Sequence, residues 1–152
     1  VFGILAKLTR TIFISRSSSS ALKQLQLIAH LLSNSERLIL FPEGTSSDGR
    51  KVLPFKPSLF EAPIQADAIV QPLTIRYEKI NGMPVDRRSK PFLAWYGNMD
   101  LLPHLWQSLS LGTITIKIVF HKPIRAIVFS NRKKLASHCQ KIIALESEKS
   151  NQ

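Results

Sequence analysis

The order of three segments near the start of the chain restricts its possible folds more than any other feature. Residues 11–14 (Thr-Ile-Phe-Ile) and 37–41 (Arg-Leu-Ile-Leu-Phe) are rich in β-branched, aromatic and aliphatic side chains, so both are predicted as short buried strands. Between them, apolar residues recur at helical spacing, at Ala21, Leu25, Ile28, Ala29 and Leu32. A strand, a helix and a strand with short connections are typical of a parallel βαβ unit. We therefore predict an α/β fold with a mixed, largely parallel central sheet flanked by helices.

The remaining segments indicate one domain without internal repeats. Residues 1–8 are predicted as the end of a helix, and the serines at 17–20 as the loop that caps the helix after them. Pro72 interrupts a predicted strand at 68–77, which indicates an edge, a bulge or a strand end. The other predictions are a short helix that starts at 57–60, a loop at 79–91, a strand at 92–96, a helix at 100–111, an alternating strand at 113–120 and an amphipathic helix at 131–145. We assign residues 1–146 to a single domain and residues 147–152 to a polar tail.

The charge of the chain favours an anionic partner. Its formal net charge is +11, although its hydrophobic content of 44 % is that of an ordinary folded domain. Nucleic acid, an anionic membrane surface, and a phosphorylated or acyl-carrier substrate all fit this charge. Basic residues cluster at 87–90 and 132–134, but no aromatic residues are interleaved with them as a single-strand-binding platform would require. A nucleic-acid partner therefore rests on charge alone, and we expect none; surface charge or contacts with lipid headgroups explain the clusters more simply.

Several site types find no support in the sequence. The single cysteine, Cys139, stands at helical spacing with Ala136 and Ile143, so we expect a buried structural thiol. There is no Cys/His cluster with metal-ligand spacing and no Gly-Lys-Ser/Thr phosphate loop, so neither a metal nor a nucleotide site is expected. No run of about 18 apolar residues exists to cross a bilayer.

The segment 41–49 (Phe-Pro-Glu-Gly-Thr-Ser-Ser-Asp-Gly) is the strongest candidate for a site. It directly follows the predicted strand at 37–41, and open α/β sheets place ligands at the carboxyl ends of strands. A loop of Pro, Gly, small hydroxyls and a carboxylate can offer backbone N–H groups and polar side chains to a ligand. Asp48-Gly49 is predicted as a turn.

Four segments in order give the chain a specific resemblance. Residues 41–46 resemble the Phe-Pro-Glu-Gly-Thr block of the glycerolipid acyltransferases, the family of 1-acylglycerol-3-phosphate (lysophosphatidic acid) acyltransferases. Residues 11–16, a strand that ends in Arg16, resemble the second block of that family. Phe55-Lys56 with Phe60, and residues 70–73 (Val-Gln-Pro-Leu), resemble segments that follow the third block. The resemblance covers residues 1 to about 75 and implies a glycerol-3-phosphate acyltransferase-like fold.

The resemblance implies an acyl-acceptor pocket lined by Arg16, Glu43, Gly44, Thr45 and Lys56. The chemistry of these residues is compatible with that role. An arginine offers a fixed fork of donors to a phosphate, and a lysine offers a mobile point charge. A carboxylate can accept from a hydroxyl, a glycine lets the backbone approach closely, and a threonine adds a hydroxyl and an N–H. Taken singly, each residue is better explained by a solvated or turn-forming role. Their occurrence together and in family order favours the binding role for Arg16, Glu43, Gly44 and Lys56, whereas Thr45 fits a loop cap as well as a binding role.

The chain departs from the family pattern in three places. Ser46 stands where the family often has arginine, so a phosphate contact is lost or comes from Arg50 or Lys51. Pro57-Ser58 replaces the glycine that often follows Phe-Lys. The family's catalytic His-x4-Asp is absent: the residues five positions after His30, His104, His121 and His138 are Ser35, Leu109, Ala126 and Ile143. Because the chain begins with Val1 inside an apolar segment, we expect an N-terminally truncated fragment, with the catalytic dyad upstream of Val1.

The resemblance implies an O-acyltransferase that moves an acyl group from acyl-CoA or acyl-carrier protein to the free hydroxyl of a lysophospholipid such as 1-acylglycerol-3-phosphate. It implies no cofactor beyond the acyl thioester, and peripheral binding to the cytoplasmic face of the inner membrane. The fragment itself would be inactive. Lyso-ornithine-lipid acyltransferases share these blocks, so that acceptor stays open. A non-catalytic lipid- or anion-binding module that uses Arg16 and Lys56 is the alternative from another class.

Overall fold

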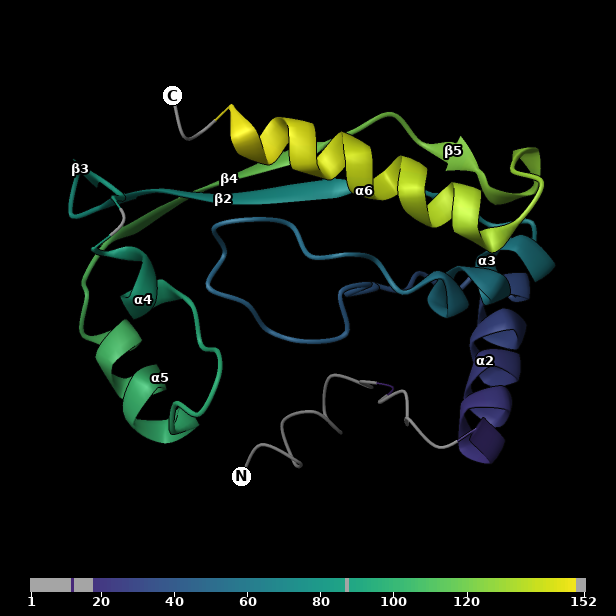
Figure 1. Ribbon diagram of the computed structural model, residues 1–152, viewed down its shortest axis with the longest axis horizontal. Coiled ribbons are helices and arrows are strands. Elements are labelled where there is room, and N and C mark those ends of the chain that lie inside the picture. Colours follow the sequence, from purple (N-terminus) through teal and green to yellow (C-terminus); the bar gives the residue numbers. More distant parts are fainter. Residues whose placement is uncertain (1–11, 13–17, 87, 150–152) are drawn as a thin grey trace.

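The computed structural model describes residues 12, 18–86 and 88–149 of the chain (Figure 1). Its helices are α2 (Ser18–Ser33), the 3₁₀ helix η1 (Pro57–Phe60), α3 (Glu61–Gln65), α4 (Lys90–Leu93), α5 (Leu101–Leu109), the 3₁₀ helix η2 (Ala126–Val128) and α6 (Arg132–Glu148). Its strands are β1 (Ile69–Val70), β2 (Leu73–Ile80), β3 (Met83–Pro84), β4 (Ile114–Phe120) and β5 (Ile124–Arg125). The class is mixed α/β, as predicted.

The described strands form two small antiparallel sheets. One has the order β3-β2-β4, with Leu73 opposite Phe120 and Ile80 opposite Ile114. The other pairs β1 with β5. The interruption predicted at Pro72 is confirmed, because β1 ends and β2 begins on either side of it and the two strands pair with different partners. Proline has no N–H for a ladder, so it separates the two pairings.

The prediction of a largely parallel central sheet is wrong for the part of the chain that the structure describes. All pairings among the described strands are antiparallel. Residues 37–41 have no strand partner there, and the side chains of Ile39 and Phe41 are exposed. The predicted neighbour at 11–14 lies outside the described residues, apart from Ile12, as does the predicted helix at 1–8. A strand needs hydrogen bonds to a neighbour, so apolar composition alone does not make 37–41 one.

Three further boundaries differ from the prediction. Residues 92–96 form the end of α4 and a loop instead of a strand, and Pro91 stands in the first turn of that helix. The expected loop at 79–91 contains a hairpin, because Asn81 and Gly82, with φ of 50° and 80°, turn β2 back into β3. Finally, α2 already begins at Ser18, inside the serine run predicted as a loop.

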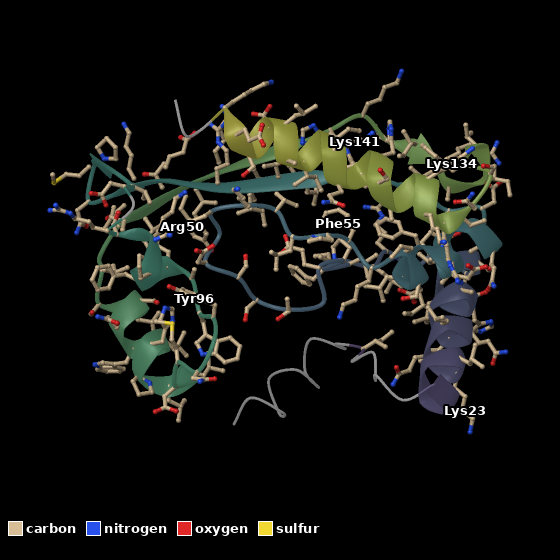
Figure 2. The ribbon with its side chains drawn as sticks, viewed as in Figure 1. Lys23, Arg50, Phe55, Tyr96, Lys134 and Lys141 are labelled. Atoms are coloured by element: carbon tan, nitrogen blue, oxygen red, sulfur yellow. The ribbon has the colours of Figure 1, made fainter. Side chains whose placement is uncertain are left out.

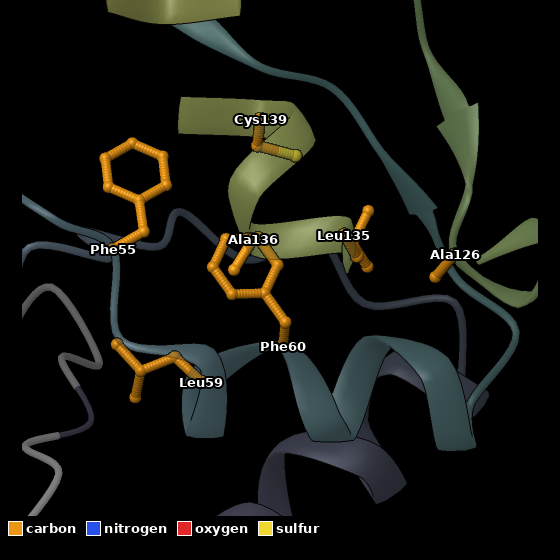
Figure 3. Packing of buried hydrophobic residues seen from close by; sticks show 7 residues of the cluster. All are labelled: Phe55, Leu59, Phe60, Ala126, Leu135, Ala136 and Cys139. Atoms are coloured by element: carbon orange, nitrogen blue, oxygen red, sulfur yellow. The ribbon is translucent and has the colours of Figure 1, made fainter. Parts of the chain in front are cut away.

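The core lies between α6, η1 and the segment just before η1 (Figure 3). Its buried members are Phe55, Leu59, Phe60, Ala126, Leu135, Ala136 and Cys139. The predicted C-terminal helix is confirmed: Asn131 caps α6 by accepting from the backbone N–H of Lys134 at 3.0 Å. Burial raises the pKa of the Cys139 thiol to about 11, as expected of a structural cysteine.

The two faces of the β2–β4 pair have different surroundings. Side chains alternate along a strand, so Thr74 and Arg76 point to one face and Ile75 and Tyr77 to the other. Helix α6 lies along the first face (Figure 1), where Arg76 pairs with Glu146 of α6 at 3.3 Å. On the second face, the apolar side chains are exposed: Ile75, Tyr77, Ile116, Ile118 and Phe120. The sheet thus turns its polar face toward α6 and its apolar face away from α6.

No described helix has both the length and the apolar character required to cross a bilayer.

Candidate functional site

The loop that leads from residue 41 to η1 begins with a tight turn. The N–H of Gly44 donates to the carbonyl of Phe41 at 3.2 Å, with Pro42 and Glu43 as the central residues. Proline fits the first central position because its ring presets φ, and the chain leaves the turn through Gly44 at φ 62°, in the left-handed region. The sequence Pro-Glu-Gly therefore encodes the turn locally.

Lys56 holds this turn from the other end of the loop. Its backbone N–H donates to the carbonyl of Pro42 at 2.9 Å, and its Nζ donates to the carbonyl of Gly44 at 3.4 Å. A Cβ on residue 44 would lie 2.6 Å from that Nζ and 2.9 Å from its Cε. Glycine is therefore favoured at residue 44 for two reasons, its left-handed backbone and the lysine side chain that lies on it. Two predicted site residues, Gly44 and Lys56, are in direct contact.

The core fixes the backbone position of Lys56. Phe55, only 7 % exposed, stacks on Phe60 with 6.2 Å between ring centroids (Figure 3). The N–H of Phe55 donates to Oε1 of Gln140 on α6 at 3.4 Å. Pro57 then starts η1. Lys56 thus sits between a buried aromatic anchor and a helix start, with its side chain exposed.

Glu43 lies in the centre of the turn and is half-buried. Desolvation by burial raises the pKa of its carboxyl, and a backbone hydrogen bond with Leu53 opposes that change in part. A carboxylate kept from full hydration gains more from a ligand that donates to it. Glu43 is therefore suited to accept from a hydroxyl or an ammonium group.

The outer part of the loop is polar, and its contacts described here join residues close together in the sequence. Thr45 is exposed, and its Oγ1 makes only a long 3.5 Å bond to the carbonyl of Ser46. The turn predicted at Asp48-Gly49 is confirmed: Oδ1 of Asp48 accepts from the N–H of Arg50 at 3.0 Å, and Gly49 has φ 68°. Nε of Arg50 pairs with the same carboxylate at 3.3 Å, which compensates its charge.

Arg16 lies outside the described residues, so the structure does not place it. Each of the four histidines of the chain contacts a residue other than an aspartate. His30 contacts Asn34, His104 donates to the carbonyl of Pro91 at 3.1 Å, His121 contacts Thr74 at 2.8 Å, and the ring of His138 packs on Phe129. No histidine is hydrogen-bonded to an aspartate in the described ranges, which also contain no His/Cys/Asp/Glu cluster able to hold a metal ion.

Two contributors to the site were missed from sequence. Gln140 lies 85 residues after the backbone N–H that it accepts from, and no local pattern marks it. The carboxyl of Glu43 and the backbone of Leu53 meet because the loop closes on itself. The proline and glycine of the turn signal a bend but not which groups the bend brings together.

A small cavity of about 130 Å³ lies beside the outer end of the loop. Gly49 lines it from the loop, Tyr77 from β2, and Lys90 and Leu93 from α4. The loop therefore runs from the core-anchored Lys56 to the neighbourhood of α4. The inner part offers one cation, Lys56 on Gly44, and one carboxylate, Glu43, on neighbouring residues of the turn. This combination can bind an anion and a donor group of the same ligand.

Comparisons with known proteins agree with the sequence blocks. The model of the family described as Acyltransferase matches residues 1–76. The chain is 38 % identical over 144 residues to a lyso-ornithine lipid O-acyltransferase of Brucella abortus (strain 2308), covering 90 % of this chain and 54 % of that protein. It is 36 % identical over 144 residues to a lyso-ornithine lipid O-acyltransferase of Rhizobium meliloti (strain 1021), covering 90 % and 49 %.

A second group of relatives has another acceptor in its name. The chain is 31 % identical over 121 residues to a 1-acyl-sn-glycerol-3-phosphate acyltransferase of Neisseria gonorrhoeae, covering 79 % of this chain and 45 % of that protein. The chain thus spans about half the length of the curated relatives it matches. No solved structure matches it.

Proposed function

Because this chain belongs to the Acyltransferase family, we propose that it forms the acceptor-binding part of an enzyme that transfers an acyl group from a thioester to the hydroxyl of a lyso-lipid. The observation that carries the proposal is the contact between Lys56 and Gly44, which holds a cation on the turn beside the half-buried Glu43. We assign the binding of the acceptor headgroup to Glu43, Gly44 and Lys56. Arg16 and Thr45 are proposed members of the same pocket on the resemblance alone.

We propose lyso-ornithine lipid as the acceptor. The relatives in Brucella abortus and Rhizobium meliloti carry this substrate in their names. Ornithine is an amino acid with a carboxylate and a side-chain amine, and a lysine beside a glutamate can satisfy both charges. The loop also has Ser46 where the family often has arginine, and Arg50 is paired with Asp48. With Ser46 in place of arginine and Arg50 paired with Asp48, Lys51 is the remaining cation of the outer loop, and this smaller positive charge favours a zwitterionic headgroup over a phosphate.

The second candidate acceptor is 1-acylglycerol-3-phosphate. The relative in Neisseria gonorrhoeae supports it, at lower identity and coverage. With this acceptor, Lys56 and Arg16 would bind the phosphate and Glu43 a glycerol hydroxyl. The two acceptors differ in the charge of the headgroup, which the same pocket must match.

The proposed reaction needs a base from outside these 152 residues. A histidine of the family's His-x4-Asp motif would take the proton of the acceptor hydroxyl. The hydroxyl oxygen attacks the thioester carbonyl, the C–O bond forms as the C–S bond breaks, and the thiolate leaves and takes up a proton. Acyl-CoA or acyl-carrier protein supplies the acyl group. The role of Glu43 and Lys56 is to hold the hydroxyl near the base and the thioester. We place the enzyme at the cytoplasmic face of the cell membrane as a peripheral protein, because its acceptor is a membrane lipid.

The test is a transfer assay with the intact enzyme in detergent micelles, with a radiolabelled acyl thioester and each acceptor in turn. Replacing Lys56 with methionine removes one charged hydrogen bond to the headgroup, so the acceptor KM should rise about 10- to 100-fold. The matched control is Lys23→Met, which removes an equal charge from the exposed surface of α2, far from the loop (Figure 2). It should leave the acceptor KM unchanged.

Three results would contradict the proposal. The first is an intact enzyme that binds lyso-lipid but transfers acyl groups to neither acceptor, which would favour the non-catalytic module. The second is an unchanged acceptor KM in Lys56→Met. The third is an acceptor KM raised as much by Lys23→Met as by Lys56→Met. A preference for 1-acylglycerol-3-phosphate over lyso-ornithine lipid would support the second acceptor instead of the first.

A further inference from the structure

The side of α6 opposite the core is basic. Residues 132–145 of this helix include four Lys and Arg residues and no Asp or Glu. Lys134 and Lys141 are two helical turns apart, so they lie on one stripe of the helix, and both side chains are exposed. Figure 2 shows the two lysines along the same edge of α6. The buried residues of the helix, on its other side, are Leu135, Ala136 and Cys139.

The positive charge of this stripe is uncompensated. In the described part of the chain, no carboxylate forms an ion pair with either lysine. Two acidic residues at this end of the molecule are already paired with arginines. Glu61 of α3 binds Arg132 at 2.9 Å, and Asp67 binds Arg125 of β5. The two lysines are therefore available to an anionic partner.

The 3₁₀ helix η2 adds two exposed apolar side chains beside the same stripe. Ile127 is 55 % exposed and Val128 is 76 % exposed. The next residue, Phe129, packs against the core, and its ring centroid lies 5.0 Å from that of His138 on α6. His138 is one helical turn after Lys134 and so lies on the basic stripe. The exposed apolar pair thus ends next to the lysines.

We propose that this surface, formed by Lys134, Lys141, Ile127 and Val128, docks the protein on an anionic bilayer. The two ammonium groups contact anionic headgroups, and the two aliphatic side chains enter the boundary between headgroups and acyl chains. Charge complementarity selects an anionic partner, and the aliphatic pair selects a bilayer, because nucleic acid would leave these side chains in water. The inference deepens the proposed function and rests on its membrane-lipid acceptor.

Docking along α6 also keeps the proposed acceptor site close to the bilayer. Gln140, directly before Lys141, accepts from the backbone N–H of Phe55, and Lys56 is the next residue of the loop. A helix with its side chains is about 10 Å wide. Lys56 therefore lies roughly one helix width from the headgroups that Lys141 contacts, which gives a lyso-lipid a short path to the site.

The first test measures partitioning of the intact protein onto vesicles of phosphatidylcholine and phosphatidylglycerol by sedimentation. Lys141→Gln should weaken this binding about fivefold and leave binding to pure phosphatidylcholine vesicles unchanged, because it removes one headgroup contact. The matched control is Lys23→Gln, which removes an equal charge at the end of α2 that points away from α6 (Figure 2). The control should bind as the wild type does.

Two results of this test would overturn the proposal. Unchanged vesicle binding by Lys141→Gln would remove the basic stripe from the contact. An equal loss in Lys23→Gln would show that total charge drives binding and not this surface.

The second test probes insertion of the apolar pair on the same vesicles. Val128→Gln should weaken binding about tenfold, because it removes one apolar side chain from the lipid contact. The matched control is Leu109→Gln: Leu109 is 71 % exposed on α5, at the other end of the molecule (Figure 1). The control should bind as the wild type does. Wild-type binding by Val128→Gln, or an equal loss in Leu109→Gln, overturns the proposal.

The docking surface and the proposed function fail separately. Acyl transfer is assayed in detergent micelles, so it does not depend on docking to vesicles. Normal transfer by a protein that shows neither of the two expected losses on vesicles would overturn the docking surface and leave the proposed function standing. Both expected losses in a protein that transfers to neither acceptor would support the docking surface and contradict the proposed function.

Discussion

Substitution of Gly44 by alanine tests the central feature of the site, the contact between the turn and Lys56. The residue has φ 62°, a conformation that L-amino acids with a Cβ adopt at a cost of about 1–2 kcal/mol. The new Cβ would also lie 2.6 Å from Nζ and 2.9 Å from Cε of Lys56. No backbone atom is that close, so the lysine side chain would move away instead of the loop.

The two effects of this substitution have separate magnitudes. The backbone cost should lower the free energy of unfolding by about 1–2 kcal/mol, or the Tm by roughly 2–8 °C for a domain of this size. Displacement of the Lys56 ammonium removes a charged contact to the acceptor headgroup, worth about 1.5–3 kcal/mol. The acceptor KM should therefore rise about 10- to 100-fold.

Gly49→Ala is the matched control for the backbone effect. Gly49 has φ 68° in the same loop, and a Cβ there would meet no atom within 4 Å. The two variants should show similar losses of stability in urea unfolding of the intact protein. In the transfer assay, only Gly44→Ala should show the raised acceptor KM, with the thioester KM unchanged.

Two results would refute this reasoning. If Gly49→Ala raised the acceptor KM as much as Gly44→Ala, the loss would come from loop strain and not from Lys56. If Gly44→Ala left the acceptor KM at its wild-type value, the position of the Lys56 ammonium on Gly44 would have no part in binding. The double variant Gly44→Ala/Lys56→Met supplies a check, since it should lose no more affinity than Lys56→Met alone.

Three other predictions concern groups around the same loop. Burial raises the pKa of Glu43, so ionisation of its carboxyl lowers the free energy of unfolding. As pH rises from below 4.5 through the folded pKa, the wild type should therefore lose stability relative to Glu43→Gln in urea unfolding. Cys139, whose pKa is about 11, should react with a thiol reagent only on unfolding, so labelling in native buffer that precedes unfolding would contradict its burial. Phe55→Ala should lower the free energy of unfolding by about 3–5 kcal/mol, measured by calorimetry or denaturation, because it opens a cavity beside Phe60 and frees the loop end that carries Lys56. A loss below about 1 kcal/mol would mean that the stack does not anchor the loop.

Local chemistry explains which elements the sequence predicted correctly. The alternating isoleucines of 113–120 predicted a strand, the amphipathic spacing of 131–145 predicted α6, and Pro72 predicted the break between β1 and β2, because each effect acts within a few residues. The parallel βαβ unit depends on partners far along the chain, and apolar content at 37–41 cannot supply them. Residues 92–96 were predicted as a strand, but Pro91 in the first helical turn and the packing of α5 favour a helix that ends at Leu93.

The candidate site was predictable in its residue types and less so in its contacts. Glycine and lysine were expected to serve one ligand, and the structure brings Gly44 and Lys56 together directly. Their mutual contact arises from the path of the loop between residues 44 and 56, which no spacing rule describes. The support from Gln140 of α6 is likewise a tertiary contact. The roles of these residues in acceptor binding stay predictions until the variants are assayed.

The outward apolar face of the β2–β4 pair has a consequence for handling the protein. Five exposed apolar side chains share this face, and β3 pairs with β2 only at Lys79 and Ile80; the five are Ile75, Tyr77, Ile116, Ile118 and Phe120. Open strand edges next to apolar faces promote aggregation. We therefore expect a preparation of these residues by themselves to aggregate as its concentration rises, and detergent choice and dilution will matter for any work on it.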